Sequence, residues 1–246
     1  MGTIPPYSEW LHCAFWSPHR SLGPSALDIE RGLPDANLGF TRLALGGHCC
    51  RGVSTSKPSH ARTELSAHNR PDHADNPYCH AAAWHEAGHA IANVVVGSVE
   101  IEASVEHRDI CIGRVTSLGL KDPDPADPEQ RRYLVALIFA AYAGRVAEQL
   151  FWSTVPPEKR PTINAAWAND QENMMLYAER LANDSTTRAE ALECGMNYTI
   201  DFFKQPVNQD AVARIGKALH AALKLDDSTI RKLCGSDLSV APIPYC

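Results

Sequence analysis

Two histidines with a glutamate between them are the residues of this sequence best suited to chemistry, in the run His85-Glu86-Ala87-Gly88-His89. On an α-helix, residues four apart lie on the same face one turn from each other, so both imidazoles can reach one metal ion with Glu86 beside it. This H-E-x-x-H pattern is typical of zinc hydrolases. The composition of the chain predicts only roughly 0.03 accidental matches to it.

The residues around the motif favour a helix. Asn76 and Pro77 supply an N-cap and a proline at the first helical position. Three valines, Val94–Val96, continue the apolar body, and Gly97 is placed to end the helix. A core helix that carries two histidines by accident is the alternative to a metal-binding helix.

A catalytic zinc ion takes three protein ligands and a water, so the two histidines leave one ligand open. Glu148, Asp170 and Glu172 lie on helices predicted later in the chain, and by residue type all three are candidates. Zinc lowers the pKa of its bound water, and Glu86 can take a proton from that water as it attacks a peptide carbonyl. Glu86 can then pass the proton to the leaving amine.

The hydrophobic pattern predicts a mainly α-helical domain with a small β-hairpin, over residues 76–240. Apolar and polar residues alternate over 99–106, which is the period of a half-buried strand, and 110–117 can form a second strand. Gly113, in the second strand, is a candidate bulge or point of close backbone approach. The edge of this hairpin is a candidate site to which an extended peptide could add as a further strand.

Five further helices are expected after the hairpin, each bounded by capping residues, prolines or loops. They are predicted at about residues 128–151, 164–181, 186–204, 207–224 and 228–234. The first starts at Asp127-Pro128 and has apolar residues at helical spacing, so we expect it to be the core helix. Glu148 lies on this helix and needs a partner if it is buried, because an isolated carboxylate is costly away from water.

Residues 1–75 show neither a strand nor a helix period, so we expect a disordered N-terminal extension there. For the whole chain, the net charge of −6 and a pI near 6.0 predict no attraction for nucleic acid or anionic lipid. The longest apolar run, Tyr133–Ala143, is short of the roughly twenty residues that a membrane-spanning helix needs. We therefore expect no membrane span.

The eight cysteines include no C-x-x-C pair, which predicts reduced thiols rather than a disulfide framework or a zinc ribbon. The first residues lack the basic and apolar regions of a signal peptide. Together these features predict a cytoplasmic protein.

The order of the motifs resembles the peptidase domain of the FtsH family of ATP-dependent zinc metalloproteases, peptidase family M41. The resemblance covers about residues 78–235 and is carried by four segments: His85–Ala90, Ala143–Glu148, Asn169-Asp170 with Met174–Leu181, and Ala218-Leu219 with Leu225–Arg231. In that family the aspartate of the Asn-Asp pair is the third zinc ligand, and the resemblance transfers this role to Asp170. Glu148 then becomes a carboxylate that orients a ligating imidazole or packs between helices, and Glu172 a solvated residue.

The sequence also departs from that family. It has no G-x-x-x-x-G-K-[ST] loop, so ATP binding by these residues is not expected, and the family's AAA module and membrane segments do not occur in them. The resemblance therefore implies an ATP-independent zinc endopeptidase that cuts unfolded or flexible polypeptides. Such a domain either finds its substrate unaided or receives it from a separate unfoldase or adaptor.

Two other functions remain open. One is a non-catalytic, zinc-stabilised module that binds extended peptides on the hairpin edge. The other is a structural or adaptor protein whose motif is vestigial, which predicts no bound metal. Zinc content and cleavage that depends on Glu86 separate the three.

Overall fold

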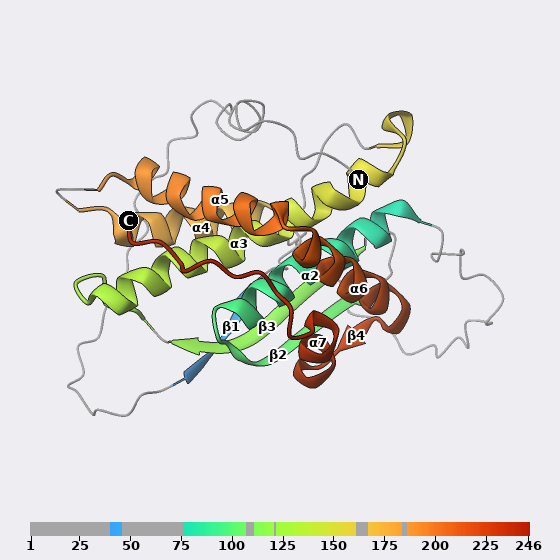
Figure 1. Ribbon diagram of the computed structural model, residues 1–246, viewed down its shortest axis with the longest axis horizontal. Helices are drawn as coiled ribbons and strands as arrows, with labels where there is room; N and C mark the ends of the chain where they lie inside the picture. Colours follow the sequence, from blue (N-terminus) through green and yellow to red (C-terminus); the bar gives the residue numbers. More distant parts are fainter. Residues whose placement is uncertain (1–39, 46–75, 107–110, 121, 161–166, 184–185) are drawn as a thin grey trace, which may run out of the picture. The chain divides into compact units, whose positions relative to one another are not determined.

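The computed structural model describes residues 40–45, 76–106, 111–120, 122–160, 167–183 and 186–246 (Figure 1). Within it, Phe40–Cys246 forms one compact unit. This unit is mainly helical and contains a small antiparallel sheet, in agreement with the predicted fold class.

The helix that carries the H-E-x-x-H motif, α2 (Pro77–Val95), lies between the sheet and the long helix α3 (Pro128–Thr154) (Figure 1). It begins as predicted, because the side chain of Asn76 accepts a hydrogen bond from the backbone N–H of Tyr78 at 2.9 Å. Just beyond the helix, Gly97 adopts a φ of +78°, a conformation that few other residues tolerate. Both ends of the motif helix are therefore set by local sequence.

The sheet has four strands in the order β1-β3-β2-β4, and all neighbours are antiparallel. The predicted hairpin is formed by β2 (Val99–Glu106) and β3 (Ile112–Leu120), so the second strand both begins and ends later than the expected 110–117. The irregularity in their pairing lies in β2, between Val99 and Glu102. Gly113 pairs regularly with Val105, so it does not form the bulge that was one of its two expected roles.

Two short strands were not predicted. β1 (Phe40–Leu45) pairs with β3, although it lies in the segment 1–75 for which the sequence predicts no regular structure. β4 (Lys224–Leu225) pairs with β2. The rest of 1–75 lies outside the described residues, so its expected disorder stays a prediction.

The remaining helices follow the predicted order. They are α4 (Ala168–Leu181), α5 (Arg188–Lys204), α6 (Pro206–Ala222), α7 (Asp227–Cys234) and the short 3-10 helix η2 (Pro157–Lys159). Helices α3, α5 and α7 each begin with an N-cap residue. The side chains of Asp127, Thr187 and Asp226 accept hydrogen bonds from backbone N–H groups of the first turn.

α3 is the core helix of this unit, because α2, α4 and α5 all pack against it. By length and composition it is also the single helix among the described residues that could cross a membrane. In this structure, however, 83% of its most apolar stretch is buried inside the protein. Side chains such as Leu134, Ile138 and Phe139 are fully enclosed, so protein contacts already cover its apolar surface.

The cysteines differ from the expectation of reduced thiols. Cys79, in the first turn of α2, is bonded to Cys111, which directly precedes β3, and Cys194 is bonded to Cys246. Among the described cysteines, Cys234 is free and buried. The partners lie 32 and 52 residues apart, and sequence spacing alone cannot reveal such pairings. Disulfides persist in oxidising compartments, so they weigh against the cytoplasmic location, which stays a prediction.

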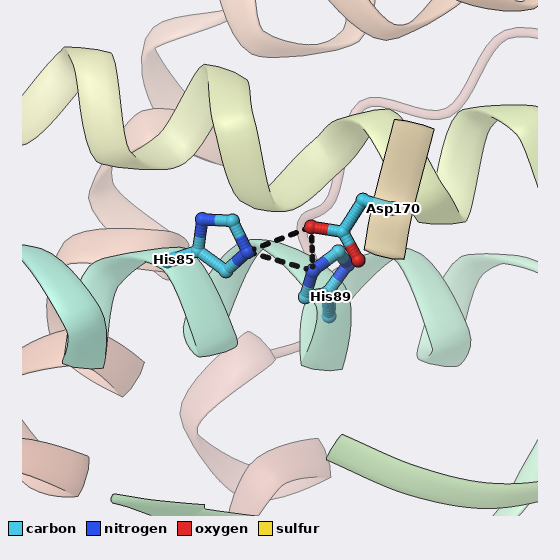
Figure 2. Close-up of side chains that lie close together, drawn as sticks. All are labelled: His85, His89 and Asp170. Atoms are coloured by element: carbon cyan, nitrogen blue, oxygen red, sulfur yellow. Dashed lines mark hydrogen bonds and ion pairs between the residues drawn. The ribbon is translucent and has the colours of Figure 1, made fainter. Parts of the chain in front are cut away.

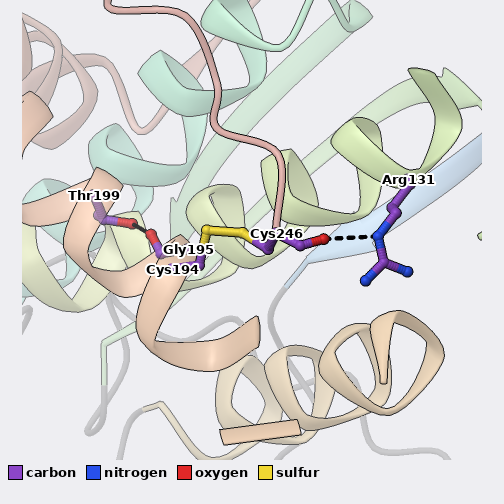
Figure 3. The surroundings of a disulfide bond; sticks show 5 residues. All are labelled: Arg131, Cys194, Gly195, Thr199 and Cys246. Atoms are coloured by element: carbon purple, nitrogen blue, oxygen red, sulfur yellow. Dashed lines mark hydrogen bonds between the residues drawn. A yellow bond between two sulfur atoms is a disulfide. The ribbon is translucent and has the colours of Figure 1, made fainter. Parts of the chain in front are cut away.

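The C-terminal residues 235–246 are tied to the helices by several contacts. Figure 3 shows the bond from Cys246 to Cys194 on α5, and Arg131 Nε of α3 donates to the Cys246 carbonyl at 2.7 Å. Tyr198 of α5 donates its hydroxyl to the carbonyl of Ala241, also at 2.7 Å. The end of the chain thus strengthens the packing of α5 on α3.

Replacing Asn76 by alanine removes the cap of the motif helix. We expect Asn76→Ala to lower the free energy of unfolding by about 1 kcal/mol, and Asn76→Asp, which keeps an acceptor oxygen, to lower it much less. Urea denaturation followed by circular dichroism measures both. Equal losses in the two variants would contradict the capping role.

Candidate metal centre

Three side chains from two helices meet at the centre of the unit. His85 and His89 come from adjacent turns of α2, and Asp170 comes from the first turn of α4 (Figure 2). His85 Nε2 lies 2.9 Å from Asp170 Oδ2, His89 Nε2 lies 3.2 Å from the same oxygen, and the two Nε2 atoms are 3.1 Å apart. All three side chains are buried.

This arrangement has the dimensions of a zinc site. Two ligands of a tetrahedral zinc ion with bonds of about 2.0–2.1 Å lie about 3.3 Å apart, close to the three observed distances. Imidazole and carboxylate are also the ligand types of catalytic zinc. Asp170 Oδ1 is buried and has no hydrogen-bond partner among the described residues, so the carboxylate still has an acceptor that a metal ion or its water could use.

The other nitrogen of each imidazole is held by the protein. His85 Nδ1 donates to Glu148 Oε2 at 3.2 Å, and His89 Nδ1 donates to the carbonyl of Ala140 at 2.8 Å. Glu148 is in turn held by Trp152, whose Nε1 donates to Oε1 at 3.0 Å. With the Nδ1 protons engaged, both Nε2 atoms are turned toward Asp170, which is the orientation that a metal ion requires.

Two glycines let α2 and α3 approach closely enough to form this site. A Cβ atom on Gly88 would collide with the backbone carbonyl of Ala143 on α3. On the opposite helix, a Cβ on Gly144 would overlap the Nε2 atoms of both His85 and His89. The backbone of α3 at Gly144 therefore forms a wall directly beside the ligand atoms.

Glu86 lies between α2 and strand β3. Its side chain is buried, and a Cβ on Gly113 would collide with Glu86 Cγ and Oε1. Gly113 is thus a point of close backbone approach, the second of its two expected roles. Glu86 Oε2 is buried without a hydrogen-bond partner among the described residues, so one carboxylate oxygen is available to take a proton.

Burial and mutual charge shift the pKa values of four groups of the site, His85, Glu86, His89 and Asp170. Burial raises the pKa of Glu86 to about 7, although the two histidines act in the opposite direction. Burial by itself lowers the pKa of His85, but hydrogen bonds to Asp170 and Glu148 outweigh it and raise the pKa to about 10. For His89 burial is likewise outweighed by Asp170, and its pKa rises. Burial disfavours ionised Asp170, yet the histidines hold its pKa well below the usual range.

The three candidates for the third ligand are now separated by position. Asp170 lies beside both Nε2 atoms, where a third ligand would have to lie, and its role as a ligand stays a prediction. Glu148 contacts the far side of the His85 ring, so it is placed to orient that ligand. Glu172 is exposed on α4.

Sequence reasoning missed several residues that support the site. Trp152 lies four residues after Glu148, a helical spacing that could have suggested their contact. Asn93 carried no such signal: its amide donates to the carbonyl of His89 at 2.9 Å, and its oxygen accepts from Ser117 of β3 at 2.8 Å. It ties the end of the motif helix to the sheet.

No known family model matches this chain, and no curated protein matches it either.

Substitutions at two glycines should separate metal binding from the position of Glu86. We expect Gly144→Ala to reduce the zinc content of the purified protein at least tenfold, because the added methyl group overlaps the Nε2 atoms of both histidines. Gly113→Ala should keep its zinc, because the three atoms nearest to the added methyl group all belong to Glu86. Zinc is measured by plasma mass spectrometry, with circular dichroism as a check of folding. A folded Gly144→Ala protein with full zinc content would contradict this geometry.

Proposed function

We propose that this protein is a zinc-dependent endopeptidase that hydrolyses peptide bonds in unfolded or flexible polypeptides. The observation that carries the proposal is the convergence of His85, His89 and Asp170 at ligand distances, with Glu86 on the next residue of the motif helix. We further propose that residues 76–240 are a peptidase domain similar to that of family M41. The order of the motifs supports this assignment.

His85, His89 and Asp170 would hold the zinc ion, which supplies a water of lowered pKa and polarises the substrate carbonyl. The residues of the chain do the rest. Glu148 and the Ala140 carbonyl fix the two imidazoles so that their Nε2 lone pairs point inward. Fixed ligands need no reorganisation during the reaction, which favours catalysis.

Glu86 moves the proton. Its Oε2 accepts a proton from the attacking water and then donates it to the departing amine, so that one water is consumed for each peptide bond broken. Gly113 leaves room for the carboxylate between α2 and β3. Burial excludes bulk water from Glu86, which strengthens its interaction with a charge that develops nearby.

A Glu86→Gln substitution tests the proposed reaction. The amide cannot accept the proton, so we expect the rate of casein cleavage to fall by about 10²–10⁴-fold at unchanged zinc content. Cleavage is followed as release of acid-soluble labelled peptides from zinc-loaded full-length protein. Glu172→Gln, which removes an exposed carboxylate from α4, is the matched control and should cleave at the wild-type rate.

Equal rates for Glu86→Gln and wild type would overturn the proposal. If zinc binds and an unfolded polypeptide binds but emerges intact after long incubation, the protein is a metal-stabilised peptide-binding module. If no zinc binds, the motif is vestigial.

A further inference from the structure

One edge of strand β3 is a candidate path for an extended polypeptide, because β3 passes close to Glu86, whose side chain lies over the face of the sheet at Gly113. β2 occupies the other edge, where Val105 pairs with Gly113 and Ser104 with Arg114. Gly113 is also the residue against which Glu86 packs. An extended polypeptide that paired with the edge of β3 opposite β2 would therefore run along the β3 backbone to Gly113, close to the proton-transferring carboxylate.

Most of this edge is taken by the chain itself. β1 pairs antiparallel with β3 from Phe40 opposite Leu120 to Leu45 opposite Val115 (Figure 1). The pairing stops two residues before Gly113. Among the described residues, no strand pairs with Ile112–Arg114 on this side. Within the described part of the chain, the segment of this edge nearest to Glu86 is thus unpaired, while Val115–Leu120 are paired with β1.

We infer that Phe40–Leu45 is a built-in competitor of the substrate, a strand that occupies the edge of β3 on which an extended polypeptide must lie to be cut. The inference rests on the proposed function. Backbone pairing depends little on side chains, so one edge can accept β1 or a substrate of many sequences. It cannot accept both, because each backbone group on that edge pairs with one strand at a time.

The direction of β1 shows which part of a substrate it would exclude. β1 runs antiparallel to β3 and approaches Gly113 with its carboxyl-terminal end, at Leu45. A substrate in the same direction would lay the residues before its scissile bond along Val115–Leu120. β1 therefore competes with the amino-terminal side of the substrate and leaves the residues at the scissile bond free to enter.

Competition by a tethered strand has a distinct kinetic effect. A segment on the same chain acts at an effective concentration of about millimolar, well above that of most polypeptide substrates. If the edge is free only about a tenth of the time, the apparent affinity for substrate falls about tenfold. Such a competitor raises KM and leaves kcat unchanged, whereas damage to the site would lower kcat.

The test uses two double variants of the full-length protein. The first variant, Arg42→Pro with Leu43→Pro, prevents β1 from pairing with β3. In an antiparallel pair, alternate residues of the edge strand donate a backbone N–H to the neighbouring strand. Proline has no N–H, so one of the two adjacent prolines always removes such a donor. Arg42→Ala with Leu43→Ala keeps every backbone donor and is the matched control. We expect the proline variant to lower KM for unfolded casein about tenfold at unchanged kcat, and the alanine variant to match wild type. Short peptides that extend mainly on the carboxyl-terminal side of the scissile bond do not compete with β1, so the wild type and both variants should cut them equally.

An unchanged or higher KM in the zinc-loaded, folded proline variant would overturn the inference while leaving the peptidase proposal intact. If no variant cleaves casein, the peptidase proposal fails, and binding decides the inference. A labelled unfolded polypeptide, followed by fluorescence anisotropy with each variant in the Glu86→Gln background, should then bind the proline variant about tenfold more tightly. Equal binding to the proline and alanine variants would rule out competition at this edge.

Discussion

The close packing of α2 against α3 is the constraint on which the rest of the structure depends. Gly88 brings the motif helix against the carbonyl of Ala143, and Gly144 lies against the imidazoles of His85 and His89. Any larger side chain at these positions would separate the helices and remove the hydrogen bond from His89 to Ala140. The same contact positions Glu148 to hold His85. The ligand geometry is therefore a consequence of helix packing.

Such a cluster is costly to bury without compensation. His85, His89, Asp170 and Glu148 are all enclosed, and each makes a hydrogen bond with another charged or polar member. Their mutual attraction offsets part of the cost of removing them from water. A divalent cation between the nitrogens and Asp170 would compensate further, which is why buried carboxylates and imidazoles so often occur together at metal sites. A purely structural role offers no comparable reason for the orphaned oxygen of Asp170.

Local sequence was enough to predict the helices and the β2–β3 hairpin, but it did not reveal contacts between distant residues. Asn76 and Gly97 bound the motif helix through interactions with near neighbours, so the helix could be predicted accurately. β1 and the pairing of Cys79 with Cys111 depend on contacts many residues away, for which a single sequence holds no signal. The third ligand could not be predicted from the residues alone either. Three acids were candidates, and only the family resemblance favoured Asp170. Its proximity to both histidines agrees with that choice.

The most direct test of this account is the position of the metal in crystals of the zinc-loaded protein. Anomalous scattering at the zinc edge should show one ion per chain, with His85 Nε2, His89 Nε2 and an Asp170 carboxylate oxygen each at about 2.0–2.2 Å. A zinc ion bound elsewhere, or one ligated by Glu148 in place of Asp170, would contradict the account.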